Sequence, residues 1–170
     1  MLKIGSLIVY GTEGVCRVVD KQLLSFSSLD DKKEYYILVP LENSSSKLYL
    51  PIDNEKLMAR VKKLLSYDEI LELIASNNEI EWIEDSKLRN KYYKEILASC
   101  DRNRILALAK QLYLIKSGKI EVTKSFTVWM DDILKKSAQI LYMEFSQVVS
   151  MTQDEILPFI SGEIVCKEKK

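Results

Sequence analysis

The sequence predicts an α+β chain in two parts, a small, strongly bent antiparallel sheet or barrel followed by an all-α bundle of four to five helices. Three observations predict this. The first 60 residues are rich in strand formers punctuated by glycine and proline. After about residue 60 the apolar residues recur with a helical period. Two Ser/Thr-x-x-Glu capping boxes occur in that second part. We therefore expect two domains, residues 1–60 and 61–170.

Four segments of the first part are predicted to be strands. A turn at 11–14 joins the first two, because its two glycines tolerate positive φ angles. Pro40 and Pro51 cannot donate a ladder hydrogen bond, so they mark strand ends or edge strands. None of these residues has the character of a catalytic group, and residues 54–63 are expected to be a short, charged join. The predicted strands lie within residues 7–11, 14–20, 33–41 and 47–52.

The second part carries five helical patterns. Ser66 and Glu69 form a capping box, in which each side chain satisfies an N–H group of the first turn. Asp101 is a good N-cap for the third helix. Thr152 and Glu155 repeat the capping box before a short last helix, which Pro158 should kink or shorten. The other predicted helices are residues 66–76, about 85–98, 101–116 and about 125–150.

Apolar stripes predict which face of each helix meets the core. On the second predicted helix, Leu88, Tyr92 and Ile96 recur every four residues and are expected to face inward. The long fourth helix has a similar set. Its expected core residues are Ile133, Leu134, Ile140, Leu141 and Phe145.

Composition excludes several classes of function. The 25 basic and 25 acidic side chains balance, so the protein has no uniformly basic surface. There is no histidine, which removes the commonest general base and metal ligand. Cys16, Cys100 and Cys166 are too far apart for a CxxC metal or redox motif. The five glycines form no phosphate-binding loop. We expect a non-enzymatic, cytoplasmic protein with no cofactor, no metal, no small-molecule substrate and no membrane segment.

The segment from residue 87 to residue 110 is locally basic, with seven cationic and two acidic side chains. On the second predicted helix, Lys87, Lys91 and Lys94 are spaced i, i+4 and i+7 and share one face. Such a face could contact the phosphates of a nucleic acid, or it could be the solvated side of an ordinary amphipathic helix. The seven basic residues are Lys87, Arg89, Lys91, Lys94, Arg102, Arg104 and Lys110.

Trp82 stands four residues before this helix and is open to two interpretations. A tryptophan beside a basic run could contact DNA. A lone tryptophan in a packed protein is more often part of a core or of a domain junction. We lean toward the packing role, and exposure of Trp82 beside Lys87 and Arg89 would contradict it.

Five stretches together resemble one family. They are "LKIGSLIVYGTEGVCRVVD", "EYYILVPL" with "KLYLPIDN", "RNKYYKEILASCD" and "DDILKKSAQILYMEF". Their order and spacing resemble the CarD/CdnL family of bacterial RNA-polymerase-binding transcription regulators, from residue 1 to about residue 160. The resemblance implies a Tudor-like N-terminal domain, shared with the transcription-repair coupling factor, and a helical domain.

The resemblance also implies two partners. The Tudor-like domain would bind the RNA polymerase β subunit by adding a strand at a sheet edge. The helical domain would contact promoter DNA, mainly its phosphate backbone, at the upstream edge of the bubble and bias the open complex. The candidate polymerase-binding residues are Tyr36, Leu38, Lys47, Leu48 and Tyr49. The candidate DNA-binding residues are Trp82, Ser86, Lys87, Arg89, Lys91 and Lys94.

Three positions depart from the family pattern. A tryptophan that wedges against DNA in many members corresponds to Ser86 here. Cys100 replaces a glycine, and Tyr49 stands where an arginine is often found. These departures keep a second function open, in which the chain is a polymerase-binding adaptor whose helices recruit another protein instead of DNA.

Overall fold

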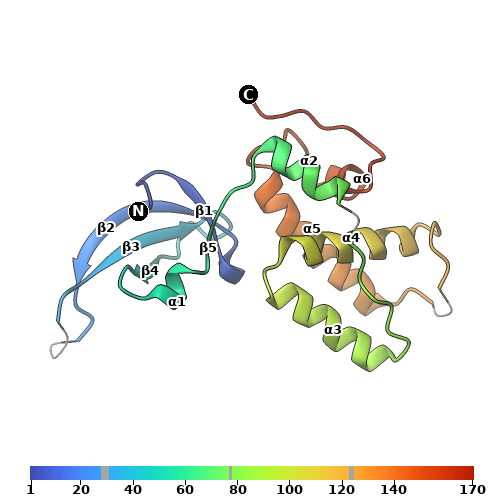
Figure 1. Cartoon of the computed structure of the whole chain (residues 1–170), viewed down its shortest axis with the longest axis horizontal. Helices are drawn as coiled ribbons and strands as arrows, with labels where there is room; N and C mark the ends of the chain where they lie inside the picture. The colour runs from blue at the N-terminus through green and yellow to red at the C-terminus, as the bar shows by residue number, and fades with distance from the viewer. Residues whose placement is uncertain (28–30, 77, 123–124) are drawn as a thin grey trace. The chain divides into compact units, whose positions relative to one another are not determined.

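A computed structural model describes residues 1–27, 31–76, 78–122 and 125–170 of the chain. The chain divides into two compact units, Met1–Leu64 and Leu65–Lys170 (Figure 1). The first unit contains an antiparallel sheet and the second contains helices. The predicted α+β class, with a small sheet before a helical bundle, is therefore confirmed.

The described residues of the first unit form a five-stranded antiparallel sheet in the order β4-β3-β2-β1-β5. The pairing register shifts between Val18 and Asp20 on β2, and such a bulge bends a strand and increases its twist. The four predicted strand segments are confirmed. The strands are β1 (Leu7–Tyr10), β2 (Val15–Leu24), β3 (Lys33–Pro40), β4 (Leu48–Pro51) and β5 (Val61–Lys63).

Residues 54–63, expected to be a short, charged join, contain a helix and a strand. A short helix, α1 (Glu55–Met58), begins where the side-chain Oδ1 of Asn54 accepts a hydrogen bond from the N–H of Leu57. β5 follows it and pairs with β1. Residues 61–63 therefore belong to the sheet and not to the helical part.

Alternation along the strands places one face of the sheet in the core of the first unit. Tyr36, Leu38 and Leu50 lie on this inner face and are buried together with Cys16 and Val18. The hydroxyl of Tyr36 accepts a hydrogen bond from the N–H of Leu2 at 3.1 Å, which ties the N-terminal segment to β3. Burial raises the pKa of the Cys16 thiol to about 11. This thiol is fully buried and packs in the core of the first unit.

The described residues of the second unit form five α-helices that pack around one apolar core. The predicted caps are confirmed at Ser66 with Glu69, at Asp85 and at Asp101. The fourth predicted helix is shorter than expected at both ends, and the last begins as a 3₁₀ turn at Gln153–Glu155. The helices are α2 (Tyr67–Ala75), α3 (Ser86–Ala98), α4 (Arg102–Lys116), α5 (Val128–Phe145) and α6 (Ile156–Ile160).

Two of the predicted core faces need correction. On α3 the buried side chains are Arg89, Tyr93 and Ile96, whereas Leu88 is 60% exposed. The stripe that faces the core thus begins one residue later than the sequence pattern indicated. On α5 the expected core residue Ile140 is exposed.

A nearly buried carboxylate ties the start of the helical unit to its interior. Glu144 on α5 accepts a hydrogen bond from the N–H of Leu65 at 3.3 Å and another from Nε of Arg102 at 2.8 Å. The Arg102 guanidinium also forms an ion pair with Glu144 at 2.7 Å. This low exposure strengthens the pair, because solvent screens it less than a surface pair.

Candidate functional site

β4 lies at one end of the sheet, where, among the described residues, it pairs with β3 alone. The N–H of Ile52 donates to the carbonyl of Glu34 at 3.0 Å, so these two residues form a hydrogen-bonded pair. Such pairs alternate along an antiparallel ladder. Leu48 and Leu50 therefore turn their main-chain groups toward β3, and Tyr49 turns its N–H and C=O outward. Tyr49 presents both a donor and an acceptor to any strand added at this edge.

The five predicted polymerase-binding residues divide into two groups. Tyr36 and Leu38 are buried on β3, which lies between two other strands, so neither their side chains nor their main chain forms an edge. These two residues support β4 from within the core. Lys47 and Tyr49 are exposed, and Leu48 packs partly against the core. The accessible part of the predicted surface is thus the segment Lys47–Tyr49.

An aromatic cluster, made of Phe26, Tyr35 and Tyr49, covers the outer face of the sheet beside this edge. The Phe26 ring meets Tyr35 at a centroid distance of 5.2 Å and Tyr49 at 5.3 Å, both edge to face. Such pairs stabilise by about 0.5–1.5 kcal/mol each beyond the area they bury. Phe26 is still 63% exposed and Tyr49 43% exposed. Ile37, the register partner of Tyr49 on the same face, is buried.

Sequence reasoning missed Phe26 and Tyr35 as surface residues. Tyr35 carried a usable signal, because it alternates with the buried Tyr36 and shares a face with Tyr49 through the β3–β4 register. Phe26 carried none, since it follows the predicted end of β2 in a polar stretch of serines.

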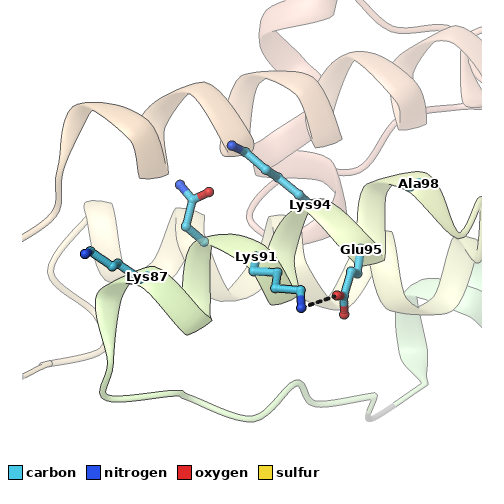
Figure 2. A pocket seen from close by; sticks show the side chains of 6 residues that line it. Lys87, Lys91, Lys94, Glu95 and Ala98 are labelled. Atoms are coloured by element: carbon cyan, nitrogen blue, oxygen red, sulfur yellow. Dashed lines mark ion pairs between the residues drawn. The ribbon is translucent and has the colours of Figure 1, made fainter.

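On α3, Lys87, Lys91 and Lys94 are exposed on one side of the helix, as their spacing predicted. We call these three residues the lysine face. They line a shallow hollow of about 470 Å³ together with Asn90, Glu95 and Ala98 (Figure 2). The Nζ of Lys91 lies 4.0 Å from a carboxylate oxygen of Glu95, one turn further along the helix. The face therefore combines three cations with one anion.

Arg89 does not belong to this face. Its side chain is only 1% exposed, and its guanidinium stacks 4.2 Å from the centre of the Trp82 ring and 5.5 Å from that of Trp129. It donates hydrogen bonds to the carbonyls of Ile83 at 2.6 Å and Glu84 at 3.3 Å. The predicted phosphate contact of Arg89 must be corrected, because a buried guanidinium held in this way does not reach a phosphate at the surface.

Trp82 is partly buried against the helical core, which supports the packing role over a direct DNA contact. Its ring holds Arg89 from one side, so it fixes the start of α3. Beside them burial raises the pKa of Tyr93 to about 12, although the Arg89 charge opposes the rise. Ser86, the residue at the family's tryptophan position, is exposed at the first position of α3.

The other cations of the basic segment are held by internal contacts. Arg102 pairs with Glu144, Arg104 lies 5.6 Å from the centre of the Tyr92 ring, and Lys110 donates to a main-chain carbonyl of α2. The local net charge seen in the sequence thus overstates the free positive surface. The exposed cations from this segment reduce to the three lysines of α3.

Two absences hold for the residues that the structure describes. No group of three or more Cys, Asp or Glu side chains there is arranged to hold a metal ion. None of the helices there combines the length and the apolar composition that a membrane crossing requires.

Comparison with known proteins gives one family match. Residues 2–62 match the model of the CarD-like/TRCF RID domain, and no curated protein matches the chain. The match covers almost all of the first unit, including the edge strand β4, and ends within the other edge strand, β5. The N-terminal unit is therefore similar to an RNA-polymerase-interacting domain, a protein-binding and not a catalytic kind of domain.

Proposed function

We propose that the chain is a CarD-like transcription regulator that binds the RNA polymerase β subunit through the outer edge of β4. The observation that carries this proposal is the match of residues 2–62 to the CarD-like/TRCF RID domain, which implies that partner. The edge at Tyr49 supplies the chemistry: an outward main-chain donor and acceptor beside exposed aromatic rings.

In this proposal the helical unit contacts promoter DNA at the upstream edge of the bubble through Lys87, Lys91 and Lys94. Three lysines on one helical face suit the phosphate backbone and carry no base-reading geometry. A DNA contact that is stronger in the melted promoter would shift the equilibrium toward the open complex. A coupling of about 1–3 kcal/mol would change the open-complex population roughly 5- to 150-fold.

The polymerase part is tested by binding the full chain to purified β subunit. Tyr49→Glu places a charge on the aromatic cluster and should weaken the interaction strongly, while circular dichroism reports an intact fold. Unchanged binding by this variant would remove the β4 edge from the proposal.

The DNA part is tested with a fork-shaped promoter fragment over a range of salt concentrations. Three phosphate contacts predict a slope of about −2 to −3 in log K against log salt. A slope near zero, or no binding at low salt, would contradict the DNA contact.

A second function is a polymerase-bound adaptor whose helices recruit another protein. One observation favours it: Leu88 is largely exposed next to the lysine face, while Arg89 is withdrawn into the core. Exposed apolar groups inside a charged rim are typical of protein-binding surfaces. The salt titration separates the two functions, since the adaptor predicts no affinity for the fork.

A further inference from the structure

The aromatic cluster occupies a defined place relative to the β4 edge. Tyr49 belongs to both, because its ring lies in the cluster and its main-chain groups face outward. The rings of Phe26 and Tyr35 extend this apolar surface inward over β3. A strand added at β4 therefore meets the cluster with one of its two faces.

The register of such a strand follows from the main-chain pattern. In an antiparallel pair, the residue opposite Tyr49 accepts from its N–H and donates to its C=O. Directly opposed side chains point to the same face of the sheet. The side chain opposite Tyr49 is thus placed on the outer face, beside Tyr49 and within reach of Phe26.

Charges on the same face indicate what kind of side chain fits there. On this face, pairs of residues from β3 and β4 lie side by side. At the far end of the ladder, Nζ of Lys33 forms an ion pair with Oδ2 of Asp53 at 3.1 Å. The next row pairs Tyr35 with Pro51, and the third pairs Ile37 with Tyr49. The cluster is bordered by this ion pair at one end, by the exposed Lys47 at the other, and by Gln22, which lies opposite Tyr35. Directly beside Tyr49 lie Phe26 and the buried Ile37, so an apolar residue is favoured at the partner position opposite Tyr49.

We propose that the polymerase strand pairs antiparallel with β4, and that Phe26, Tyr35 and Tyr49 select an apolar residue other than proline at the position opposite Tyr49. Proline is excluded because this residue must donate its N–H to the carbonyl of Tyr49. Two positions further along, Pro51 has no N–H and its carbonyl already accepts from the N–H of Asn54 at 3.4 Å, so the ladder weakens there. This inference rests on the proposed polymerase binding and adds the chemistry of the contacted residue.

Two exposed apolar residues of the same hairpin provide a matched pair for the test. Phe26 lies on the outer face, in the cluster. Leu23 is 58% exposed on β2 and is opposite Glu34, which places it on the other face. With purified β subunit as the probe, Phe26→Ala should weaken binding by roughly tenfold or more, and Leu23→Ala by less than about twofold.

The full chain carries four phenylalanines, and Phe26 alone lies in the first unit. A chain labelled with fluorophenylalanine should show a shift of the Phe26 resonance on addition of β subunit. A photoreactive phenylalanine analogue at position 26 should then cross-link to an apolar, non-proline residue in an extended segment of β.

The outcomes separate this inference from the function on which it rests. If the unmodified chain does not bind β subunit, the proposed function fails. If it binds, but Phe26→Ala binds equally well or the cross-link falls on a charged residue or on proline, the selection by the cluster is wrong and the polymerase binding stands.

Discussion

The outer edge of β4 and the lysine face of α3 are both exposed, yet they would bind by different physics. At β4 the donor and acceptor of Tyr49 lie beside aromatic rings, and binding would bury apolar surface. At α3 the side chains of three lysines line a shallow hollow, and binding would release counterions from a polyanion. Salt weakens the second mode steeply and the first very little. The salt dependence of binding therefore distinguishes a protein partner at β4 from a nucleic-acid partner at α3.

The largest expected effect tests which cations belong to the lysine face. Arg89→Ala should lower the free energy of unfolding of the helical unit by about 3 kcal/mol, because it leaves a cavity and removes two hydrogen bonds to carbonyls. Both tryptophans lie in this unit and both contact Arg89, so their fluorescence follows its unfolding directly.

Lys87→Ala is the matched control for Arg89, and it should change the stability by less than about 0.5 kcal/mol. If Arg89→Ala lowered the free energy of unfolding as little as Lys87→Ala, the guanidinium of Arg89 would be exposed to solvent. Arg89 would then return to the set of phosphate contacts.

The next largest effect tests the edge of β4. Tyr49→Pro removes the outward N–H and the ring together, and should weaken binding of the β subunit by roughly 30- to 100-fold. The sheet should persist, because the N–H of Tyr49 does not bond to β3. Calorimetric titration measures the affinity, and far-UV circular dichroism checks the fold.

Tyr49→Phe keeps the ring and the main chain, so it should bind nearly as well as the unmodified chain. If the proline variant bound normally as well, strand addition at β4 would be ruled out.

A moderate effect is expected on the salt dependence of DNA binding by the lysine face. Replacing Lys87, Lys91 and Lys94 together with glutamine should make the slope of log K against log salt less negative by about 2 to 3 for the promoter fork. Binding to the β subunit should stay unchanged. An unaltered slope would place the DNA contact elsewhere or favour the adaptor function.

The smallest effect concerns the anion within the lysine face. Glu95→Gln frees Lys91 from its ion pair and should strengthen binding to the fork by about twofold at low salt, with no effect at 0.5 M salt. Glu163→Gln makes the same change of charge elsewhere in the helical unit and serves as the control. Equal gains from both variants would show a general charge effect and no local role for Glu95.

Much of the fold could be predicted because its signals are local. The N-caps Asp85 and Asp101 act within three residues, so the starts of α3 and α4 can be read directly. β5 carries no such signal. Its three residues include two lysines, and only the distant pairing with β1 makes them a strand. A pattern of three residues is too short to show a period.

The candidate site was less predictable, because its character depends on contacts between distant segments. The local count of charges predicts that Arg89 is a surface cation. In the structure, Trp129, forty residues further along the chain, contacts Arg89 and helps to bury it. The sequence also predicts the wrong core face for Leu88. The set Leu88, Tyr92 and Ile96 has the spacing of a helical stripe, and so has the buried set Arg89, Tyr93 and Ile96. Phe26 contacts Tyr35 and Tyr49 only because β2 pairs with β3 and β3 pairs with β4.

Pro51 also has a consequence for how the protein behaves at high concentration. An open strand edge invites a second copy of the same chain to pair with it and start aggregation. If two β4 strands paired antiparallel about Tyr49, Lys47 of each copy would face Pro51 of the other. Both lysine carbonyls would then lack a donor, since proline has no N–H. Pro51 thus disfavours self-association in this register while leaving Tyr49 available to a different partner strand.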